Sequence, residues 1–464
     1  MPFCKLTSLI ISSLYKYHYK FASNRIKIFM SHNHGFTYAH EDWAAPTMVF
    51  SSMERARPGY DSDVQSSSEY EDVESVLLEK LKALAMMLQE RSKYCIVYAG
   101  AGLSTSAGIA DYASSSHSTI AAPSLSPMDA SPSISHYVLA AMYNKGLIKA
   151  MVNQNHDSLP QKAGFRQSGL NDIHGSLFDP SNPVIKMTGT LRTDLVDNLN
   201  TLSSRCDMVL VLGTSLSGMN ADRIVSECNA RTKTGGGGCV GTVMINLQRT
   251  KHDENCALRI FSRIDVAMQK LAELLHLPWL STSLYTMSNS ETTQDADALA
   301  IQLEIPRSLI LEPHVYRVRF DAEGKFFPAV EGGTVLDLRE GSFVMITSGE
   351  FAGDCGVCTT PNRRGHYRIR FMHTLSQSKE GRKGPMERAL GLWWIKIACD
   401  GGSEYEGGGY KRGIGDRYKR GLGNRYKRGI GIGDRNRRGK RRGGSCSGRG
   451  KQSNARPFPH CERD

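Results

Sequence analysis

The hydrophobic pattern between residues 75 and 280 alternates between helical and strand-like segments. Apolar residues first recur on one face of a helix: Leu77, Leu81, Leu84 and Leu88. Three short apolar runs then predict buried strands: residues 94–98, 208–212 and 243–245. Helical patterns lie at residues 136–150 and 260–276. This alternation predicts an α/β fold, with a Rossmann-like parallel sheet and helices on both faces.

A different pattern follows the α/β region. From about residue 312, short alternating runs separated by glycines predict a small antiparallel β-barrel: residues 315–320, 343–346, 367–371 and 393–395. The full prediction has five parts: an N-terminal extension and linker (1–74), the α/β domain (75–280), a polar linker (281–311), the barrel (312–399) and a tail (400–464). The tail repeats Tyr-Lys-Arg-Gly with few apolar residues, so we expect it to be disordered.

The net charge of +12 belongs to the tail. Residues 401–464 hold 18 Lys and Arg against 6 Asp and Glu, and the other 400 residues hold 40 of each. The sequence therefore predicts nucleic-acid contact only through residues 410–451, where basic side chains meet phosphates and tyrosines stack on bases. A solvated segment or a nuclear-import signal around Arg437–Arg442 is the alternative.

The N-terminus points to a different compartment from the tail. Residues 1–40 contain five Lys or Arg and no acid, a composition typical of a mitochondrial or plastid transit peptide. An over-extended start, with Met30 or Met48 as the true beginning, is equally compatible, and the tail favours the nucleus or cytoplasm. Scattered single cysteines favour a reducing compartment. No run of 18 apolar residues occurs, so we expect no membrane-spanning helix.

Candidate chemistry begins at Gly100-Ala101-Gly102-Leu103-Ser104, directly after the first predicted strand. Glycines at such a turn let backbone N–H groups approach a phosphate. The spacing differs from GxGxxG, and no acidic residue follows about 20 positions on to hold a ribose. Taken alone, this turn fits tight packing as well as dinucleotide binding.

Four further blocks follow in order: Gln154-Asn155-His156-Asp157, Lys162-Ala163-Gly164 with His174-Gly175, Gly213-Thr214-Ser215-Leu216, and Asn246-Leu247-Gln248. With the glycine turn, they resemble the sirtuin family of NAD-dependent protein deacylases over residues 75–275. The resemblance implies NAD as cofactor and an acylated lysine of a protein as substrate. The acyl group would pass to ADP-ribose with release of nicotinamide.

The resemblance also assigns roles to individual residues. The pyrophosphate would lie on Gly100, Ala101, Gly102 and Ser104, below a mobile loop that begins at Asp111 and Tyr112. The nicotinamide and its ribose would meet Gln154, Asn155 and Asp157, of which Asn155 and Asp157 would position the nicotinamide end and the attacking water. Gly213, Thr214 and Ser215 would bracket phosphate and ribose. The adenosine end would meet Asn246, Leu247, Ile264 and Asp265. His174 matches the catalytic base, a task that needs a neutral imidazole at working pH.

Three departures from the family pattern open alternatives. The nine residues between His174 and Val184 include no cysteine, so we expect no structural zinc and a reduced small domain. Ala113 stands where the family has arginine, and Met187–Arg192 replaces a Phe-Gly-Glu segment that pairs with substrate peptide. ADP-ribosyl transfer or NAD hydrolysis therefore remains an alternative, as does a degenerate NAD-binding module whose tail binds nucleic acid.

The barrel region offers weaker signals. Cys355 and Cys358 form a CxxC pair, which supplies two zinc ligands at most, with His366 and His373 as further candidates. Packing in a hairpin is the favoured interpretation, and no metal ligand is assigned. Residues 341–357 resemble the KOW-type motif of small barrels, which often bind RNA or protein. Trp393 and Trp394 could stack on a ligand, although alternation predicts that at least one is core.

Overall fold

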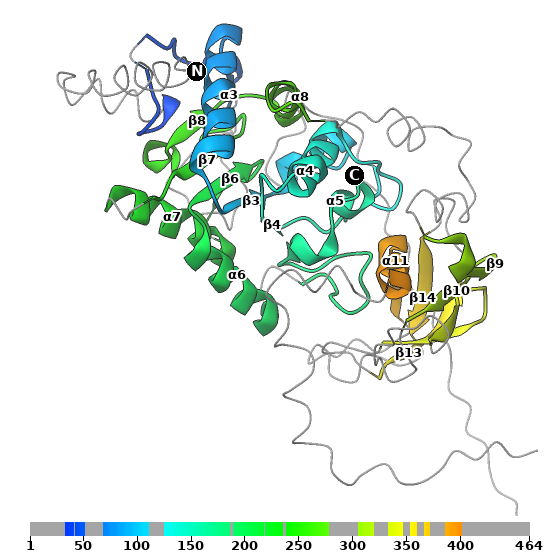
Figure 1. Ribbon diagram of the computed structural model, residues 1–464. Helices are drawn as coiled ribbons and strands as arrows, with labels where there is room; N and C mark the ends of the chain where they lie inside the picture. The colour runs from blue at the N-terminus through cyan, green and yellow to red at the C-terminus, as the bar shows by residue number, and fades with distance from the viewer. Residues whose placement is uncertain are drawn as a thin grey trace, which may run out of the picture. The chain divides into compact units, whose positions relative to one another are not determined.

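The computed structural model describes residues 33–40, 42–51, 68–110, 125–185, 189–217, 219–234, 238–277, 305–319, 333–346, 353–359, 366–371 and 386–400 (Figure 1). The expected transit peptide and the nucleic-acid contacts expected of residues 410–451 lie outside these ranges, so both stay predictions. Within the described ranges, none of the helices combines the length and apolarity needed to cross a membrane.

A six-stranded sheet organises the α/β region, with the order β5-β4-β3-β6-β7-β8 (Figure 1). Its strands are β3 (Cys95–Ala99), β4 (Ala150–Asn153), β5 (Leu170–Asp172), β6 (Met208–Leu212), β7 (Gly241–Ile245) and β8 (Leu258–Ile260). All five neighbouring pairs are parallel. The predicted parallel sheet is confirmed, and the pattern missed β4, β5 and β8.

Side chains of the central strands divide between two hydrophobic clusters. On β3, Cys95, Val97 and Ala99 pack in one cluster, whereas Ile96 and Tyr98 pack in the other. Successive side chains of a strand point to opposite faces, so a strand that is apolar throughout must be covered on both sides. Helices on both faces are therefore required by the sequence of the strand.

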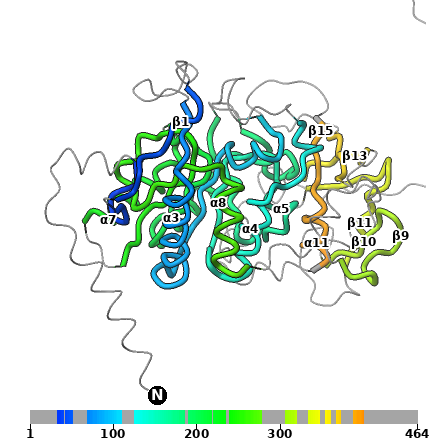
Figure 2. The backbone as a smooth tube through the Cα atoms, turned by 90° about the horizontal axis from the view of Figure 1, so that it is seen from above, coloured from blue at the N-terminus to red at the C-terminus, as the bar shows by residue number. Residues whose placement is uncertain are grey.

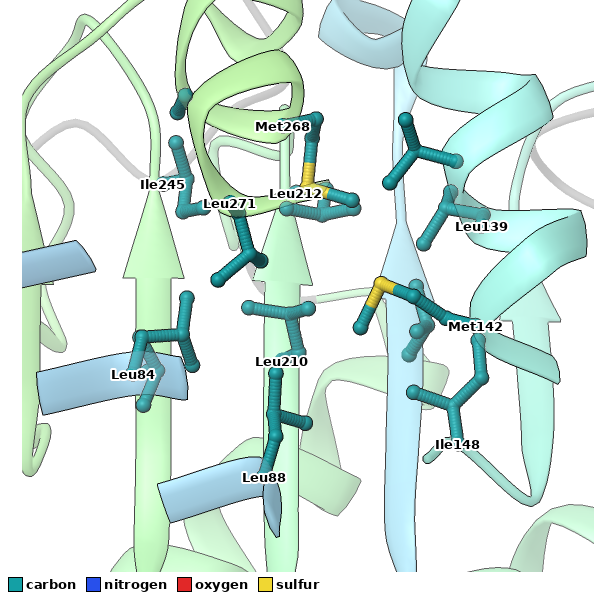
Figure 3. Close-up of a cluster of buried hydrophobic side chains, with 14 of the residues drawn as sticks. Leu84, Leu88, Leu139, Met142, Ile148, Leu210, Leu212, Ile245, Met268 and Leu271 are labelled. Atoms are coloured by element: carbon teal, nitrogen blue, oxygen red, sulfur yellow. The ribbon is translucent and has the colours of Figure 1, made fainter. Parts of the chain in front are cut away.

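Helices α3 (Glu74–Met86), α8 (Ile264–Leu274) and α4 (Ile134–Asn144) lie side by side along one face of the sheet (Figure 2). Figure 3 shows Leu84 of α3, Met142 of α4 and Leu271 of α8 around Leu210 and Leu212 of β6. The predicted leucine face is confirmed, since Leu77, Leu81, Leu84 and Leu88 are all buried in this cluster. The π-helix η1 (Met87–Arg91) continues α3.

The opposite face is covered by α6 (Thr193–Arg205) and α7 (Arg223–Lys233). The predicted helix at residues 136–150 stops earlier than the pattern indicates. Gly146 adopts a φ of +77°, which ends α4 and lets the chain turn into β4. Short helices complete the region: η2 (Ala101–Leu103), η3 (Thr105–Ala107), α5 (Leu159–Lys162), η4 (Gln167–Gly169), η5 (Asn220–Asp222) and η6 (Asp253–Asn255).

Ordered structure begins before the expected start at residue 75. Strands β1 (Thr47–Phe50) and β2 (Glu69–Glu71) form an antiparallel pair. Asp72 follows β2 and is tied to the sheet domain, because its backbone N–H donates to the Phe261 carbonyl at 2.8 Å and its carboxylate accepts from Lys80 Nζ at 2.7 Å. The polar composition concealed these contacts, since the decisive polar groups are buried and paired with one another.

The described part after residue 305 contains two antiparallel sheets. One has the order β11-β10-β9 and the other β12-β13-β14-β15. Their strands are β9 (Ile310–Glu312), β10 (Val315–Val318), β11 (Thr334–Asp337), β12 (Phe343–Met345), β13 (Cys355–Thr359), β14 (Tyr367–Phe371) and β15 (Met386–Leu390). The predicted small β domain is confirmed, and its first buried residues, Ile305 and Leu309 around η7 (Arg307–Leu309), fall within the expected linker.

The expected fourth strand run at residues 393–395 is wrong. These residues belong to helix α11 (Leu392–Asp400). Leu392, Ile395 and Cys399 recur at helical spacing and pack in the hydrophobic cluster of the β domain. Trp393 is buried, in agreement with the core interpretation of at least one tryptophan. Cys355 and Cys358 lie on β13 as expected for a hairpin, the first exposed and the second buried.

Candidate functional site

The strand order reverses between β3 and β6. The chain places β4 and β5 on one side of β3, and β7 and β8 on the other side of β6. Two connections therefore diverge at the carboxyl ends of the central pair, which is the position where ligands of open α/β sheets bind. The turns at residues 100–104 and 213–215 follow these two strands, so both predicted glycine blocks meet at this point.

The two turns touch through their glycines. Gly102 N–H donates to the Gly213 carbonyl at 2.8 Å. An added Cβ on Gly213 would lie 2.5 Å from the Gly102 carbonyl carbon, and Gly213 has a φ of +60°. Two backbones approach this closely only when neither residue carries a side chain. The glycines thus serve the contact between β3 and β6 as well as any ligand above them.

We expect Gly213→Ala to lower the free energy of unfolding by about 3 kcal/mol, from left-handed strain plus backbone overlap. Gly164→Ala is the matched control: Gly164 has a φ of +89° and nothing within 4 Å of an added Cβ. It should lose only roughly 1 kcal/mol, from strain alone. Denaturant unfolding followed by circular dichroism measures both, and equal losses would contradict the close approach.

Asn155 and Asp157 hold the first glycine turn in place. Asn155 Nδ2 donates to the Gly100 carbonyl at 2.9 Å and to Ser104 Oγ at 3.1 Å. Ser104 Oγ donates to Asp157 Oδ2 at 2.6 Å, and the other oxygen of Asp157 accepts the Leu159 N–H at 2.9 Å. Both side chains come from the segment after β4, so the structure brings together the predicted residues of the first two blocks.

Gln154 joins the same end of the sheet through two residues that the sequence analysis missed. Its Nε2 donates to the Tyr98 hydroxyl, which donates to Asp222 Oδ1 at 2.7 Å. Thr214 Oγ1 donates to Gln154 Oε1 at 3.4 Å. Burial raises the pKa of Tyr98, and the Asp222 carboxylate raises it further, so the hydroxyl stays protonated. A tyrosine hydroxyl inside an apolar strand was the available signal, because buried hydroxyls need partners.

His174 lies between this network and a second histidine. Its Nδ1–H donates to the Gln154 carbonyl at 3.3 Å, since a carbonyl only accepts. In the neutral ring, Nε2 is then the basic nitrogen. Burial lowers the pKa of His174 below its ordinary value of 6.5, and the His156 ring, 6.4 Å away between centroids, lowers it further. His174 is therefore neutral at pH 7 and can accept a proton.

A buried carboxylic acid supports the segment that carries His174. Asp172 accepts Asn153 Nδ2 at 2.9 Å and Gln161 Nε2 at 2.8 Å. Burial raises the pKa of Asp172 to about 7, although both amide donors oppose this rise. Gly175 then turns the chain at a φ of +84°, and Ile185 N–H donates to the His174 carbonyl at 3.0 Å. The short segment after His174 thus closes on itself, where sirtuins carry zinc-binding cysteines.

The four residues predicted to contact the adenosine of NAD lie in different surroundings, some beside the second glycine turn and some in the hydrophobic core. Asn246 follows β7, and its Nδ2 donates to the Thr214 carbonyl at 3.4 Å, which joins it to the second turn. Leu247 and Ile264 are buried, and Ile264 packs in the hydrophobic core. Asp265 Oδ1 accepts Ser133 Oγ at 2.9 Å and the Ser135 N–H at 3.0 Å, at the start of α4, and its predicted contact with the adenine stays a prediction.

Some predicted features cannot be placed. Asp111, Tyr112 and Ala113 lie outside the described residues, as does Met187 of the peptide-pairing segment. Ser215 is described, and its Oγ lies 2.5 Å from Ser217 Oγ. Over the described ranges, no group of three or more His, Cys, Asp or Glu side chains is arranged to hold a metal ion.

The sheet order, the reversal at β3 and β6, and the polar network at their carboxyl ends define a Rossmann-like α/β domain. In sequence, the chain is similar to the NAD-dependent protein deacetylase SRT1 of Arabidopsis thaliana, with 26% identity over 266 residues that cover 47% of this chain and 54% of SRT1. It is 24% identical over 254 residues to the NAD-dependent protein deacetylase Sirt6 of Drosophila melanogaster, covering 44% and 78% of the two chains. The resemblance to the sirtuin family is thereby confirmed.

The extent of the match is limited. The chain spans about half the length of the SRT1 proteins from Arabidopsis thaliana and Oryza sativa subsp. indica. No protein-family model matches it. Among solved structures, one titled "Structural Basis for the Mechanism and Regulation of Sir2 Enzymes" matches with a TM-score of 0.35 and 18% identity, covering 43% of this chain and 98% of that chain. Another, titled "The Structural basis for Sirtuin Substrate affinity", has a TM-score of 0.35 and 25% identity, covering 42% and 97%.

Proposed function

We propose that residues 75–280 form an NAD-dependent protein-lysine deacylase, which transfers an acyl group to ADP-ribose and releases nicotinamide. The observation that carries the proposal is the position of His174. Its neutral ring lies at the same end of the sheet as both glycine turns, with Nε2 left as the proton acceptor. The names of the sequence relatives support the same reaction.

The residues at the carboxyl ends of β3 and β6 fit a dinucleotide. An added Cβ on Gly100 or Gly102 would lie within 2.8 Å of the second turn, so both turns present bare backbone. Hydroxyl and amide groups surround that backbone: Ser104, Thr214, Gln154 and Asn155. When bound, NAD would supply the electrophilic ribose carbon that carries nicotinamide. Gly100–Ser104 and Gly213–Ser215 would hold its phosphates, and Asn246 its adenine ribose.

Proton transfer is the task of His174 in this proposal. A base with a pKa somewhat below working pH stays unprotonated and still accepts a proton from a ribose hydroxyl. The hydrogen bond from Nδ1 to the Gln154 carbonyl orients the ring and keeps Nε2 unprotonated. His156 is held by a similar bond, from its Nδ1–H to the Gly175 carbonyl at 3.0 Å. The His156 ring lies close to the His174 ring and lowers the pKa of His174.

An acylated lysine within an extended peptide is the proposed substrate. The titles of two solved relatives name peptide complexes, "Sir2-p53 peptide-NAD+" and "Sir2 bound to acetylated peptide". Backbone pairing of a peptide tolerates changes of side chain, so the altered segment around Gly189 remains compatible with such binding. Assays with peptides that carry different acyl groups would identify which acyl group and which protein sequence the enzyme accepts.

The test is nicotinamide release from NAD by the purified full chain, measured with and without an acetyl-lysine peptide. We expect release that depends on the peptide, together with loss of the acetyl group in equal amounts. The same peptide with unmodified lysine is the control. Peptide-independent release would instead support NAD hydrolysis or ADP-ribosyl transfer. NAD binding without release would support a non-catalytic NAD module.

A further inference from the structure

Three cysteines gather near the amino ends of the sheet strands, whereas the proposed NAD site lies at the carboxyl ends. Cys206 follows α6, Cys228 lies in α7, and Cys239 precedes β7. Cys206 comes two residues before β6, and Cys239 two residues before β7, so both lie at the amino ends of parallel strands. The glycine turns lie at the carboxyl ends. The thiols therefore take no part in the proposed deacylation.

The three sulfur atoms are close to one another and to a cationic side chain. Cys228 Sγ lies 3.9 Å from Cys239 Sγ. Arg231, one turn along α7 from Cys228, donates through Nη2 to Cys206 Sγ at 3.1 Å and to the Cys206 carbonyl at 2.9 Å. The Thr232 hydroxyl lies 3.4 Å from Cys239 Sγ. Two thiols are buried, and Cys239 is half-buried, which gives a small solute access to its sulfur.

The surroundings of the three thiols separate one with a raised pKa, Cys228, from two with lowered pKa values, Cys206 and Cys239. A hydrogen bond with Cys228 lowers the pKa of Cys239 to about 5, with smaller contributions from Thr232 and Arg231 and in opposition to burial. A hydrogen bond with Cys228, together with Arg231, also lowers the pKa of Cys206. The pKa of Cys228 is raised in return. A cysteine that is both partly exposed and ionised is reactive toward oxidants, whereas buried neutral thiols are inert.

We propose that Cys239 and Cys228 form a dithiol site that hydrogen peroxide oxidises to a disulfide, with Cys206 as the proton acceptor for Cys228. No other component is needed, because peroxide is the oxidant and the three side chains supply the nucleophile, the resolving thiol and the base.

The reaction balances in two steps. The Cys239 thiolate attacks one peroxide oxygen: an S–O bond forms, the O–O bond breaks, and the leaving hydroxide is protonated to water. Cys239 is now a sulfenic acid, oxidised by two electrons. Cys228 then passes its proton to the Cys206 thiolate, and its sulfur attacks Cys239: the S–S bond forms, the S–O bond breaks, and the leaving hydroxide takes the proton from Cys206, so that a second water leaves and the Cys206 thiolate is restored.

The geometry permits the bond after a small movement. The two sulfur atoms must approach from 3.9 Å to about 2.05 Å. Gly238, directly before Cys239, has a φ of +92° and nothing within 4 Å of an added Cβ, so the chain there is not packed against a neighbour. Cys239 packs against the hydrophobic cluster that contains Cys228, so the movement that closes the bond is toward a cluster that it already contacts. The bond would tie α7 to the start of β7.

The test treats the reduced full chain with a stoichiometric amount of hydrogen peroxide, followed by peptide mapping under non-reducing conditions. We expect a linked peptide pair containing Cys228 and Cys239 in the wild type. Cys206→Ser should slow its formation, because Cys228 loses its proton acceptor. Cys355→Ser is the matched control, since Cys355 is an exposed thiol on β13, and it should form the link at the wild-type rate.

A second measurement needs no variant. Iodoacetamide at pH 6 should alkylate Cys239 roughly fivefold to tenfold faster than Cys355 in the same protein, because a higher thiolate fraction outweighs the lower intrinsic nucleophilicity of an acidic thiol. Equal alkylation rates, or oxidised protein that contains only sulfenic acid or other pairings, would overturn the proposal.

Discussion

Replacing His174 with alanine is expected to lower peptide-dependent nicotinamide release by about 10²- to 10⁴-fold, the usual contribution of a general base. NAD binding should persist, because the His174 ring donates to the Gln154 carbonyl, which lies outside both glycine turns. Initial rates and equilibrium NAD binding on the same preparation separate the two effects. Loss of binding in parallel with rate would indicate a structural role.

His276→Asn is the matched control for this substitution. His276 is exposed at the end of α8 with a φ of +50°, a conformation that asparagine tolerates. It should leave the rate unchanged. A pH profile adds a second readout: the acid limb should lie below pH 6.5, because the pKa of His174 is lowered. His156→Gln should move that limb toward higher pH. An unmoved limb would contradict the contribution of His156 to the lowered pKa of His174.

Replacing Lys80 with methionine is expected to lower the free energy of unfolding by about 3–5 kcal/mol, the usual cost of leaving one charge of a buried pair without its partner. Lys80 and Asp72 are both fully buried, and Nζ lies 2.7 Å and 2.8 Å from the two carboxylate oxygens. Burial lowers the pKa of Lys80 to about 8 and raises that of Asp72. Urea unfolding measures the loss.

Two further variants test the physical reason. Lys270→Met removes a lysine that pairs with Glu74 at the surface, and it should leave the urea midpoint unchanged, because exposed pairs contribute little. The double variant Asp72→Asn with Lys80→Met should recover part of the loss. Asparagine keeps an acceptor for the Phe261 N–H, which donates to Asp72 at 2.9 Å, and it removes the unpaired charge. If the double variant recovers none of the lost free energy of unfolding, the loss in Lys80→Met comes from packing rather than from the unpaired charge.

Lys80 also explains why the ordered domain includes residues before 75. Its Nζ donates to the Asn33 carbonyl at 3.3 Å and lies 5.7 Å from the centre of the Trp43 ring. A single lysine of α3 thus holds two N-terminal segments against the sheet domain. A lysine at this position of an amphipathic helix looks like an ordinary solvated residue in the sequence, because partners about 40 residues away leave no local signal.

Several features of this protein follow from local sequence. The run 94–98 is apolar at every position, and such a strand is stable only between two helical layers, so the α/β architecture was determined before any tertiary contact was known. The glycines at 100, 102 and 213 follow strands, and a strand-to-helix turn that approaches another backbone requires glycine. His174 was assigned as the catalytic base because its motif follows the first glycine turn and precedes the second one along the chain.

Tertiary structure alone decided which polar side chains work together. The carboxylate of Asp265 accepts the Ser135 N–H at the start of α4, 130 positions away along the chain. Tyr98 and Asp222, 124 positions apart, meet through a hydrogen bond. Residues 393–395 form a helix because one face of α11 is covered by the β domain. The spacing of apolar residues along the chain is a local property, so a short segment of sequence is enough to predict a helix or a strand. Partners of buried polar groups depend on where the chain returns in space, so they become known only when the sheet has been assembled.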